Sequence, residues 1–439
     1  MARMPTIPLR RTLRKLFGPT YLMALARETG AVTRQRKVNI SALFWTLVLG
    51  FGVGRTRTLA GLRRAYEKNT GQTLVPSSFF DRFTDGLVKM LKHAAAKALT
   101  TNLGVGRALR GHLAAFEDVI MTDSTVIRLH DLLGKAYPAC RTNHTKAALK
   151  AHAILSVTGS GKQSVKVTAE RRHDGPVFRV GKWVRGRLLL FDLGYFRYQL
   201  FSCITRNGGY FLTRLKRNCN PLIVALNRVH RGRTVPLVGR RLREVIGSLQ
   251  RGILDVTVTV RFQRRRYAGK QRQADQTLRV VGVRDQRTGD YHLYLTNIPP
   301  QKLVAEDIQA TYAARWLIEL LFAEWKTRYR LADMPSGKKT VVEALLYAAL
   351  ITLAVSRRLF HALRSKLSEE QRERLKPLRW AAVFEAVAPD LLRIVCKAPS
   401  KVRDIEADVV RTILHEAPDP NASRPGLLQA VENGLHAYA

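Results

Sequence analysis

The sequence predicts a mixed α/β protein with helical regions at both ends. Helical spacing of apolar residues dominates the first 115 or so residues and the region after residue 360. Between them, short runs rich in β-branched residues are separated by glycine-containing turns, in the order of three strands followed by strand, helix and strand. With 439 residues, 46% hydrophobic and 8% aromatic, the chain can bury a large core, which excludes a disordered protein.

The N-terminal region, residues 1–115, is predicted to be helical and to bind DNA. The stretch 55–91 has helical spacing, a break at Gly71, and Ser77 or Ser78 as the N-cap of the next helix. A helix, a turn and a basic helix are typical of helix–turn–helix DNA binding, although an ordinary helical bundle explains the pattern nearly as well. The arginines concerned are Arg55, Arg57, Arg63 and Arg64.

Two apolar strands in the middle of the chain carry a carboxylate. The run "EDVIMTDSTVIRL" is strand-like around Asp123, and "RLLLFDLGY" is a strand over 188–191 with Asp192 directly after it. An unpaired carboxylate beside a buried strand is costly, so both residues are candidate site residues. We assign 116–218 and 297–360 to one α/β domain.

Residues 219–296 are predicted to form a β-rich insertion into that domain. In "DVTVTVRF", the apolar residues of 256–262 alternate with polar ones, as in a half-buried strand. The C-terminal region, 361–439, is predicted to be helical, with a proline-rich linker over 418–425 before one last helix.

The charge of the chain indicates a polyanionic partner. There are 75 Lys and Arg residues against 33 Asp and Glu, a formal net charge of +42, and the pI is near 11.0. Such an excess favours DNA or RNA as the partner, with a basic protein that binds neither as the alternative. The four cysteines form no CxxC pair, so we expect no zinc site and a reducing cytoplasm.

Two apolar stretches raise the question of a membrane. The stretches 42–53 and 341–355 are shorter than the roughly 20 apolar residues that a spanning helix needs. We therefore expect core helices and no membrane association, and no secretory signal follows the basic N-terminus.

The segment "YAARWLIELLFAEWK" (312–326) combines an apolar helix with a polar stripe. On a helical wheel its four stripe residues fall within about 60° of each other. They are Tyr312, Arg315, Glu319 and Lys326. Burial over most of the wheel indicates that the stripe faces a cleft, whereas the alternative is a solvated face with an incidental i,i+4 ion pair.

Glu319 completes a set of three carboxylates with Asp123 and Asp192. Three hard oxygen ligands suit two Mg²⁺ or Mn²⁺ ions, which activate a water or a 3′-hydroxyl for phosphoryl displacement. His144 and His152 lie near the first aspartate and could assist, but solvated or core histidines are the favoured interpretation. No glycine-rich phosphate loop is present, so no nucleotide cofactor is expected.

These motifs resemble the DDE transposases of bacterial insertion sequences, specifically the insertion-sequence-four family. The family's Y-x2-R-x3-E-x6-K motif is matched with every spacing kept, and "TDST" and "FDLGY" resemble its two aspartate blocks. The second block departs from the family at Leu193, where arginine is usual. The resemblance covers about residues 117–330 and implies a ribonuclease H-like catalytic domain with a β-rich insertion.

The resemblance also implies roles for single residues. Asp123, Asp192 and Glu319 would bind two metal ions. The DNA-binding residues would be Tyr312, Arg315, Trp316 and Lys326, with Trp316 stacking on a flipped base. Core packing of that tryptophan is the alternative interpretation.

The implied activity is cut-and-paste DNA transposition. The protein would cleave the ends of its own element and join the 3′ ends to target DNA, as a homodimer on double-stranded DNA in the cytoplasm. The alternatives are a nuclease of the same fold and a non-catalytic DNA-binding remnant of a transposase.

Overall fold

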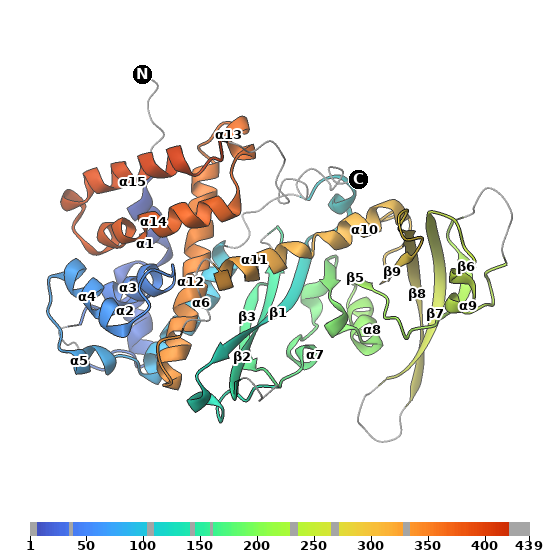
Figure 1. Ribbon diagram of the computed structural model, residues 1–439, viewed down its shortest axis with the longest axis horizontal. Coiled ribbons are helices and arrows are strands. Elements are labelled where there is room, and N and C mark those ends of the chain that lie inside the picture. The colour runs from blue at the N-terminus through green and yellow to red at the C-terminus, as the bar shows by residue number, and fades with distance from the viewer. Residues whose placement is uncertain are drawn as a thin grey trace.

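One nine-stranded sheet and the helices around it organise the chain (Figure 1). The computed structural model describes residues 7–34, 38–102, 109–140, 145–158, 161–228, 236–264, 272–327 and 334–420. The protein has the mixed α/β architecture that the sequence predicts.

The strand order across the sheet is β3-β2-β1-β4-β5-β9-β8-β7-β6. The strands are β1 (Val119–Leu129), β2 (Ala147–Ser156), β3 (Ser164–Ala169), β4 (Leu188–Phe191), β5 (Tyr210–Arg214), β6 (Leu222–Leu226), β7 (Ile253–Gln263), β8 (Gln273–Arg284) and β9 (Tyr291–Thr296). Strands β1, β2 and β3 are antiparallel neighbours, whereas β1, β4 and β5 are parallel. Helix α8 (Tyr198–Arg206) makes the crossover that the parallel pair β4–β5 requires, which confirms the predicted order of strands.

The segment predicted as a β-rich insertion extends this same sheet. Strand β9 pairs antiparallel with β5, with Leu212 opposite Thr296, and β8, β7 and β6 follow outward. The alternation predicted for 256–262 is present, since the three valines of β7 are at most 5% exposed. Most of the basic turn after β7 lies outside the described residues, and the boundary of 219–296 as a domain stays a prediction.

The two faces of the sheet pack against different helices. On what we call the α11 face, β1 contributes Val119 and Met121 to a core shared with α6 (Asp85–Asn102), α10 (Ala305–Ala313), α11 (Trp316–Thr327) and α12 (Lys339–Arg364). On the opposite face, which we call the α7 face, Ile120 joins a second core with α8 and α9 (Leu242–Ile246). Helix α7 (Asp174–Val177) lies on this second side.

The helices from the two ends of the chain form one helical body beside the sheet, with α12 between them (Figure 1). The Arg10 side chain donates to the carbonyls of Ile394 (3.1 Å) and Lys397 (3.1 Å), so it caps the end of a C-terminal helix. The remaining helices are α1 (Leu9–Leu16), α2 (Pro19–Glu28), α3 (Ile40–Thr46), the π-helix η1 (Leu47–Phe51), α4 (Leu59–Thr70), α5 (Pro76–Phe80), α13 (Glu369–Glu373), α14 (Pro377–Cys396) and α15 (Arg403–Glu416). The predicted helical regions are present among the described residues and share one core, whereas the predicted last helix after the proline-rich linker lies outside the described residues.

Helix α12 is longer than the apolar stretch 341–355 suggested. Its 26 residues are the one described helix long and apolar enough to cross a membrane by length and composition, but 83% of its apolar window is buried in the protein. Thr352 Oγ1 donates to the Val48 carbonyl in η1 at 2.6 Å. The helix therefore packs as the core helix that we predicted.

The predicted helix–turn–helix stretch contains α4, α5 and the start of α6. Gly71 ends α4 with a φ of +74°, a left-handed conformation that favours glycine, so the predicted break is confirmed. The predicted N-cap is wrong, because α5 begins at Pro76 with Val75 as its N-cap. Proline suits the first helical position, since its fixed φ matches the helix and its missing N–H is not needed there.

Two of the four arginines in this stretch are used inside the protein. Arg63 donates to Glu67 Oε1 and to the Leu74 carbonyl, each at 2.7 Å. The Arg57 guanidinium lies 4.3 Å from the centre of the Phe51 ring. Arg55 and Arg64 are exposed, so they are the pair available to an external partner.

Replacing Arg63 by alanine should reduce the free energy of unfolding by about 1–2 kcal/mol, because it removes the hydrogen bond that ties α4 to the Leu74 carbonyl and the i,i+4 pair with Glu67 inside α4. Arg64→Ala, on the exposed side of the same helix, is the matched control and should change stability by less than about 0.5 kcal/mol. Urea unfolding of both variants measures the difference, and equal losses would contradict the assignment of Arg63 as structural.

Candidate active site

The sheet brings the two predicted aspartates together. Strands β1 and β4 pair in parallel with Thr122 opposite Phe191, so Asp123 and Asp192 follow that pair on neighbouring strands. Such strands lie roughly 4.8 Å apart. Asp192 comes directly after β4 and caps a short 3₁₀ turn, accepting a hydrogen bond from the Gly194 N–H at 3.5 Å.

The segment 312–326 is two helices where we predicted one. Helix α10 ends at Ala313 and α11 begins at Trp316, with a tight turn between them. The Arg315 N–H donates to the Tyr312 carbonyl at 3.0 Å, an i→i−3 bond that winds the chain more tightly than an α-helix. The four polar residues are therefore not the stripe of one continuous helix, although Arg315 contacts both Tyr312 and Glu319.

Arg315 links the carboxylates from the sheet and the helix. Its Nη2 lies 2.6 Å from Glu319 Oε1 and its Nη1 lies 3.7 Å from Asp123 Oδ2. The Arg315 side chain is only 15% exposed, so this contact is partly screened from water. The i,i+4 pair from the sequence is present, and it points at β1 and not into solvent.

The carboxylates act on one another electrostatically. Burial raises the pKa of Asp123 to about 6, the Ser124 N–H and Arg315 oppose this rise, and the negative charges of Asp192 and Glu319 add to it. Carboxylates that repel each other in a partly buried site favour the binding of cations, because a cation relieves the repulsion.

Tyr312 is largely buried, beside Arg315, whose guanidinium carbon lies 5.6 Å from the Tyr312 ring centre. The Tyr312 side chain is 8% exposed, its ring centre is 5.4 Å from that of Tyr294, and its hydroxyl donates to the Phe191 carbonyl at 3.3 Å. Phe191 is the residue before Asp192, so this hydrogen bond gives Tyr312 a positioning contact, and its contact with a phosphate stays a prediction. The turn after Ala313 leaves Tyr312 on the buried side of α10.

Trp316 and Lys326 are exposed. Trp316 is 51% exposed, which excludes the core-packing alternative. Partial burial, and then the nearby charge of Arg128, lower the pKa of Lys326. Both side chains are therefore accessible to a ligand outside the protein.

The donor set fits divalent metal ions, although the side chains are not yet arranged around one. Among the described residues, no group of three or more His, Cys, Asp or Glu side chains has the arrangement of a formed metal site. The Arg315 guanidinium lies between Asp123 and Glu319, where it neutralises the charge that a metal ion would neutralise. Three carboxylates are the hard oxygen ligands that Mg²⁺ and Mn²⁺ prefer.

A family model described as "Transposase DDE domain" matches residues 114–355, more than half of the chain. The chain belongs to the DDE transposases of insertion sequences. These are enzymes that cleave DNA and transfer its strands, which confirms the resemblance seen in the motifs.

Known relatives of this transposase are similar over most of their length. The transposase for insertion sequence element IS231F of Bacillus thuringiensis subsp. israelensis is 22% identical over 83% of this chain and 82% of its own. The transposase for insertion sequence element IS1151 of Clostridium perfringens is 20% identical over 84% of each chain. A putative transposase of Sinorhizobium fredii is 27% identical over 54% of this chain and 59% of its own. A cryo-EM structure of the piggyBac transposase synaptic complex with hairpin DNA aligns with 97% of this chain at 12% identity, and its TM-score of 0.42 is too low for a comparison of the two folds.

The transposase has a fourth acid near the site that its sequence did not reveal. Asp174 Oδ2 and Asp192 Oδ2 are each 3.9 Å from the point that a Cβ on Gly194 would occupy. Burial acts to raise the pKa of Asp174, but contacts with His152 and Ser124 outweigh it and lower the pKa to about 2. His152 Nδ1 lies 3.1 Å from Asp174 Oδ1.

The sequence did not predict Asp174 as a site residue, because it comes near Asp192 only when α7 packs on the opposite face of the sheet. His152 is 5% exposed, which confirms the interpretation as a core histidine, whereas His144 lies outside the described residues.

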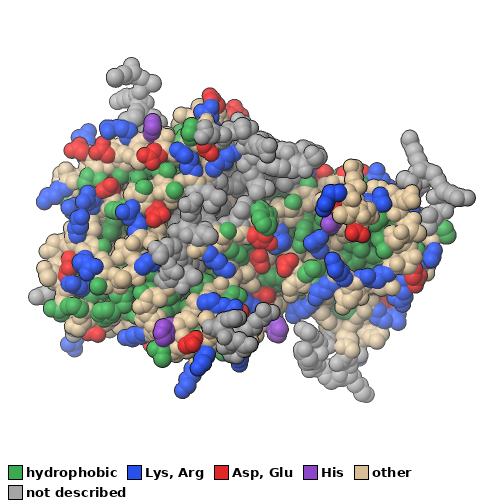
Figure 2. Space-filling model, viewed as in Figure 1, with side chains coloured by type: hydrophobic (Ala, Val, Ile, Leu, Met, Phe, Trp, Pro, Cys, Tyr) green, Lys and Arg blue, Asp and Glu red, His purple; other side chains and the backbone are tan. Residues whose placement is uncertain are grey.

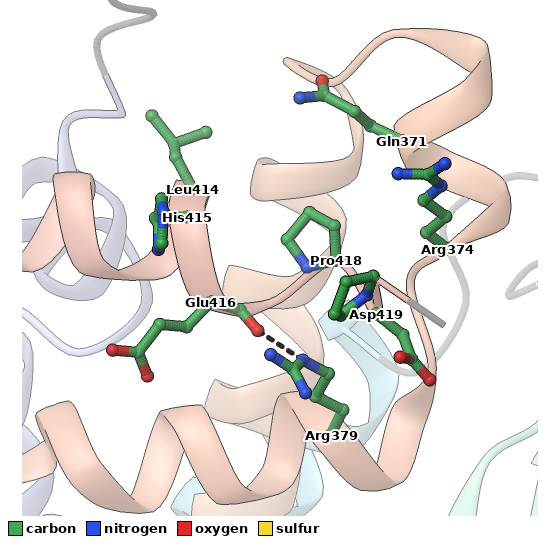
Figure 3. A pocket seen from close by; sticks show the side chains of 9 residues that line it. Gln371, Arg374, Arg379, Leu414, His415, Glu416, Pro418 and Asp419 are labelled. Carbon is green, nitrogen blue, oxygen red and sulfur yellow. Dashed lines mark hydrogen bonds between the residues drawn. The ribbon is translucent and has the colours of Figure 1, made fainter. Parts of the chain in front are cut away.

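A pocket of the transposase lies away from these residues. It has a volume of about 460 Å³ and lies between α13, α14 and α15 (Figure 3). The Arg379 Nε donates to the Glu416 carbonyl at 2.6 Å, so this guanidinium caps the end of α15. None of the predicted site residues lines this pocket, and we assign no chemistry to it.

We predict that Asp123→Asn stabilises the fold of the transposase at pH 7 in the absence of divalent metal. The pKa of Asp123 is about 6 in the folded chain against an ordinary value of 3.8, so ionisation at pH 7 opposes folding. Below pH about 4 the residue is protonated in both states and the effect disappears. The variant should gain about 1–2 kcal/mol at pH 7, and the gain should fade as the pH falls from 6 to 4.

Thermal melting with and without Mg²⁺ at pH 7 completes this test. Mg²⁺ should raise the melting temperature of the unmodified protein and not that of the variant, since a ligand that binds only the folded state stabilises it. Asp290→Asn, an exposed residue in the turn before β9, is the control and should change neither result. Equal stabilisation of both proteins by Mg²⁺ would remove Asp123 from the metal site.

Proposed function

We propose that this transposase cleaves the ends of its own insertion sequence and joins the 3′ ends to target DNA, with Asp123, Asp192 and Glu319 as its catalytic residues. The observation that carries the proposal is the convergence of these three acids from β1, the end of β4 and α11. Their separation in the sequence makes a chance meeting beside the end of β4 a poor explanation. The repulsion that raises the pKa of Asp123 indicates a place for added positive charge.

The three carboxylates would hold two divalent ions, Mg²⁺ or Mn²⁺. Bound there, the ions would activate the attacking water or 3′-hydroxyl and stabilise the leaving oxygen of an in-line displacement.

Arg315 would exchange its carboxylate partners for a DNA phosphate. In the structure it holds Asp123 and Glu319, and its planar guanidinium matches a phosphate equally well. Once the divalent ions neutralise the acids, the N–H groups of the Arg315 guanidinium would be free to bind a phosphate of the scissile strand. Lys326 would add a second phosphate contact about two turns beyond Glu319 on the same face of α11.

Trp316 would receive an unstacked base, because its exposed indole offers a flat apolar face next to Arg315. Tyr312 would act indirectly, by holding α10 to Phe191 at the end of β4, directly before Asp192.

The catalytic domain is proposed to be ribonuclease H-like. Three antiparallel strands followed by two parallel strands, with a helical crossover between them, support this assignment. The strong positive charge supports double-stranded DNA as the partner. A homodimer on DNA stays a prediction.

Each of the substitutions Asp123→Ala, Asp192→Ala and Glu319→Ala should reduce cleavage and joining by about 10³-fold or more, because loss of one ligand misplaces the ions. DNA binding should persist, since the acids do not contact phosphates. Gel shifts beside a Mg²⁺-dependent cleavage and joining assay, on DNA that carries the element's ends, measure both properties.

The same assay distinguishes the alternatives. Cleavage without joining by the unmodified protein would favour a nuclease, and binding without cleavage would favour a non-catalytic remnant. Near-normal cleavage by any one variant would remove that residue from the site.

Trp316→Ala should leave the melting temperature and the first nick unchanged, because half of the side chain already faces solvent. It should slow the later step that requires a base held out of the stack, by about tenfold or more, as loss of base–aromatic stacking costs roughly 1–3 kcal/mol. A time course of nicked, fully cut and joined products gives the result, and uniform loss of all products would contradict the stacking role.

A further inference from the structure

A cluster of cations lies on the α7 face of the sheet, opposite α11. Strand β3 is the edge strand, and its Val165 and Val167 pack toward the core on the α11 face. Lys166 lies between them in sequence, so its side chain points to the α7 face, where its register partner is His152. We define the α7-face cluster as Lys162, Lys166, Arg172 and Arg179, all of which are exposed.

The positive charges of these side chains act on one another, and no described acid forms an ion pair with them. Burial, and then the charges of Lys162, Arg179 and Arg172, lower the pKa of Lys166. Within the part of the chain that the structure describes, none of the four is in an ion pair. Basic side chains are scattered over the whole face seen in Figure 2, so a positive charge alone marks no site, whereas cations that repel one another at close range do.

The acids nearest to the cluster are already used by other residues. Asp174 is contacted by His152 at 3.1 Å and by Lys150 at 3.5 Å. Glu170 pairs with Arg128 at 3.0 Å. The cluster therefore has a surplus of positive charge that an external anion can neutralise.

Helix α7 connects the cluster to the catalytic acids. Asp174, its first residue, lies between Arg172 and Arg179 in sequence and approaches Asp192 across Gly194. The cluster is thus next to the carboxyl end of β4, on the far side of the sheet from Arg315 and Lys326. The acids lie between two separate basic surfaces.

A reaction that joins one DNA to another must hold two DNA segments at one set of acids. If the α11 face holds the element end, as the proposed function requires, the second segment needs its own contacts. We propose that the α7-face cluster binds the phosphate backbone of the target DNA duplex during joining, an inference that rests on the proposed function.

The chemistry of the cluster favours duplex backbone over bases. Its long side chains offer charge without a free stacking surface, because the nearby Trp183 ring is covered by Lys162, at 5.1 Å, and by Phe178, at 5.8 Å between ring centres. Contacts of this kind position a duplex without reading its sequence. Target binding at this surface should therefore depend on salt and tolerate many sequences.

The experiment uses the full chain with the double substitution Lys166→Gln and Arg179→Gln. Cleavage of the element ends should be unchanged, and joining to a target plasmid should fall by about tenfold or more at moderate salt. For the cut complex binding target duplex, the slope of log K against log salt should become shallower by about two, since each phosphate contact contributes about 0.9. The charge-preserving pair Lys166→Arg and Arg179→Lys should restore joining.

The matched control is Lys401→Gln with Arg403→Gln, two exposed cations at the start of α15 in the helical body. It should leave both steps unchanged. Unimpaired joining in the cluster variant would overturn the proposal, and so would a parallel loss of cleavage and joining, which would assign the cluster to the element end or to folding. Failure of the unmodified protein to cleave would instead contradict the proposed function.

Discussion

The parallel pairing of β1 with β4 is the constraint on which the site depends. It places Asp123 beside Asp192, and the two carboxylates repel each other at a partly buried position beside the end of β4. Arg315, in the turn before α11, offsets that repulsion, and Glu319 lies in the first turn of α11. Helix α11 is held against the sheet by Ile318, which is fully buried, so the polar contacts rest on an apolar one.

The outer strands of the sheet fix the position of the segment before α10, the helix that precedes α11. Asp255 and Arg279, each 5% exposed, form a bidentate pair between β7 and β8. The same guanidinium donates to the Leu303 carbonyl at 2.7 Å, just before α10. A buried pair of this kind is weak evidence for stability, but it fixes geometry, because loss of one partner would leave a buried charge unpaired. The strands that follow residue 219 thereby position the helices that carry the site.

The net charge of +42 does not translate directly into a DNA-binding surface. Arg10 and Arg379 cap helix ends in the helical body, and Arg63 ties α4 to the following segment. The Arg10 and Arg379 guanidinium groups donate to carbonyls at helix ends that would otherwise lack N–H donors. The cations that matter for a nucleic acid are the exposed ones that no internal acid neutralises, and the four residues of the α7-face cluster are of this kind.

The sequence by itself determined the local features of this protein. The strand before Asp192, the left-handed break at Gly71 and the i,i+4 pair of Arg315 and Glu319 follow from residue types and short spacings, and the structure contains all three. Membership of the transposase family was also readable from the sequence, because the residue spacings of its motifs are specific. Only the tertiary structure decided how the site is assembled. The tight turn before Trp316 buries one motif residue and exposes another, and Asp174 reaches the site from the opposite face of the sheet. Periodicity encodes the geometry of neighbours along the chain, whereas these contacts depend on which strands and helices pack together, and that choice is made by the whole core.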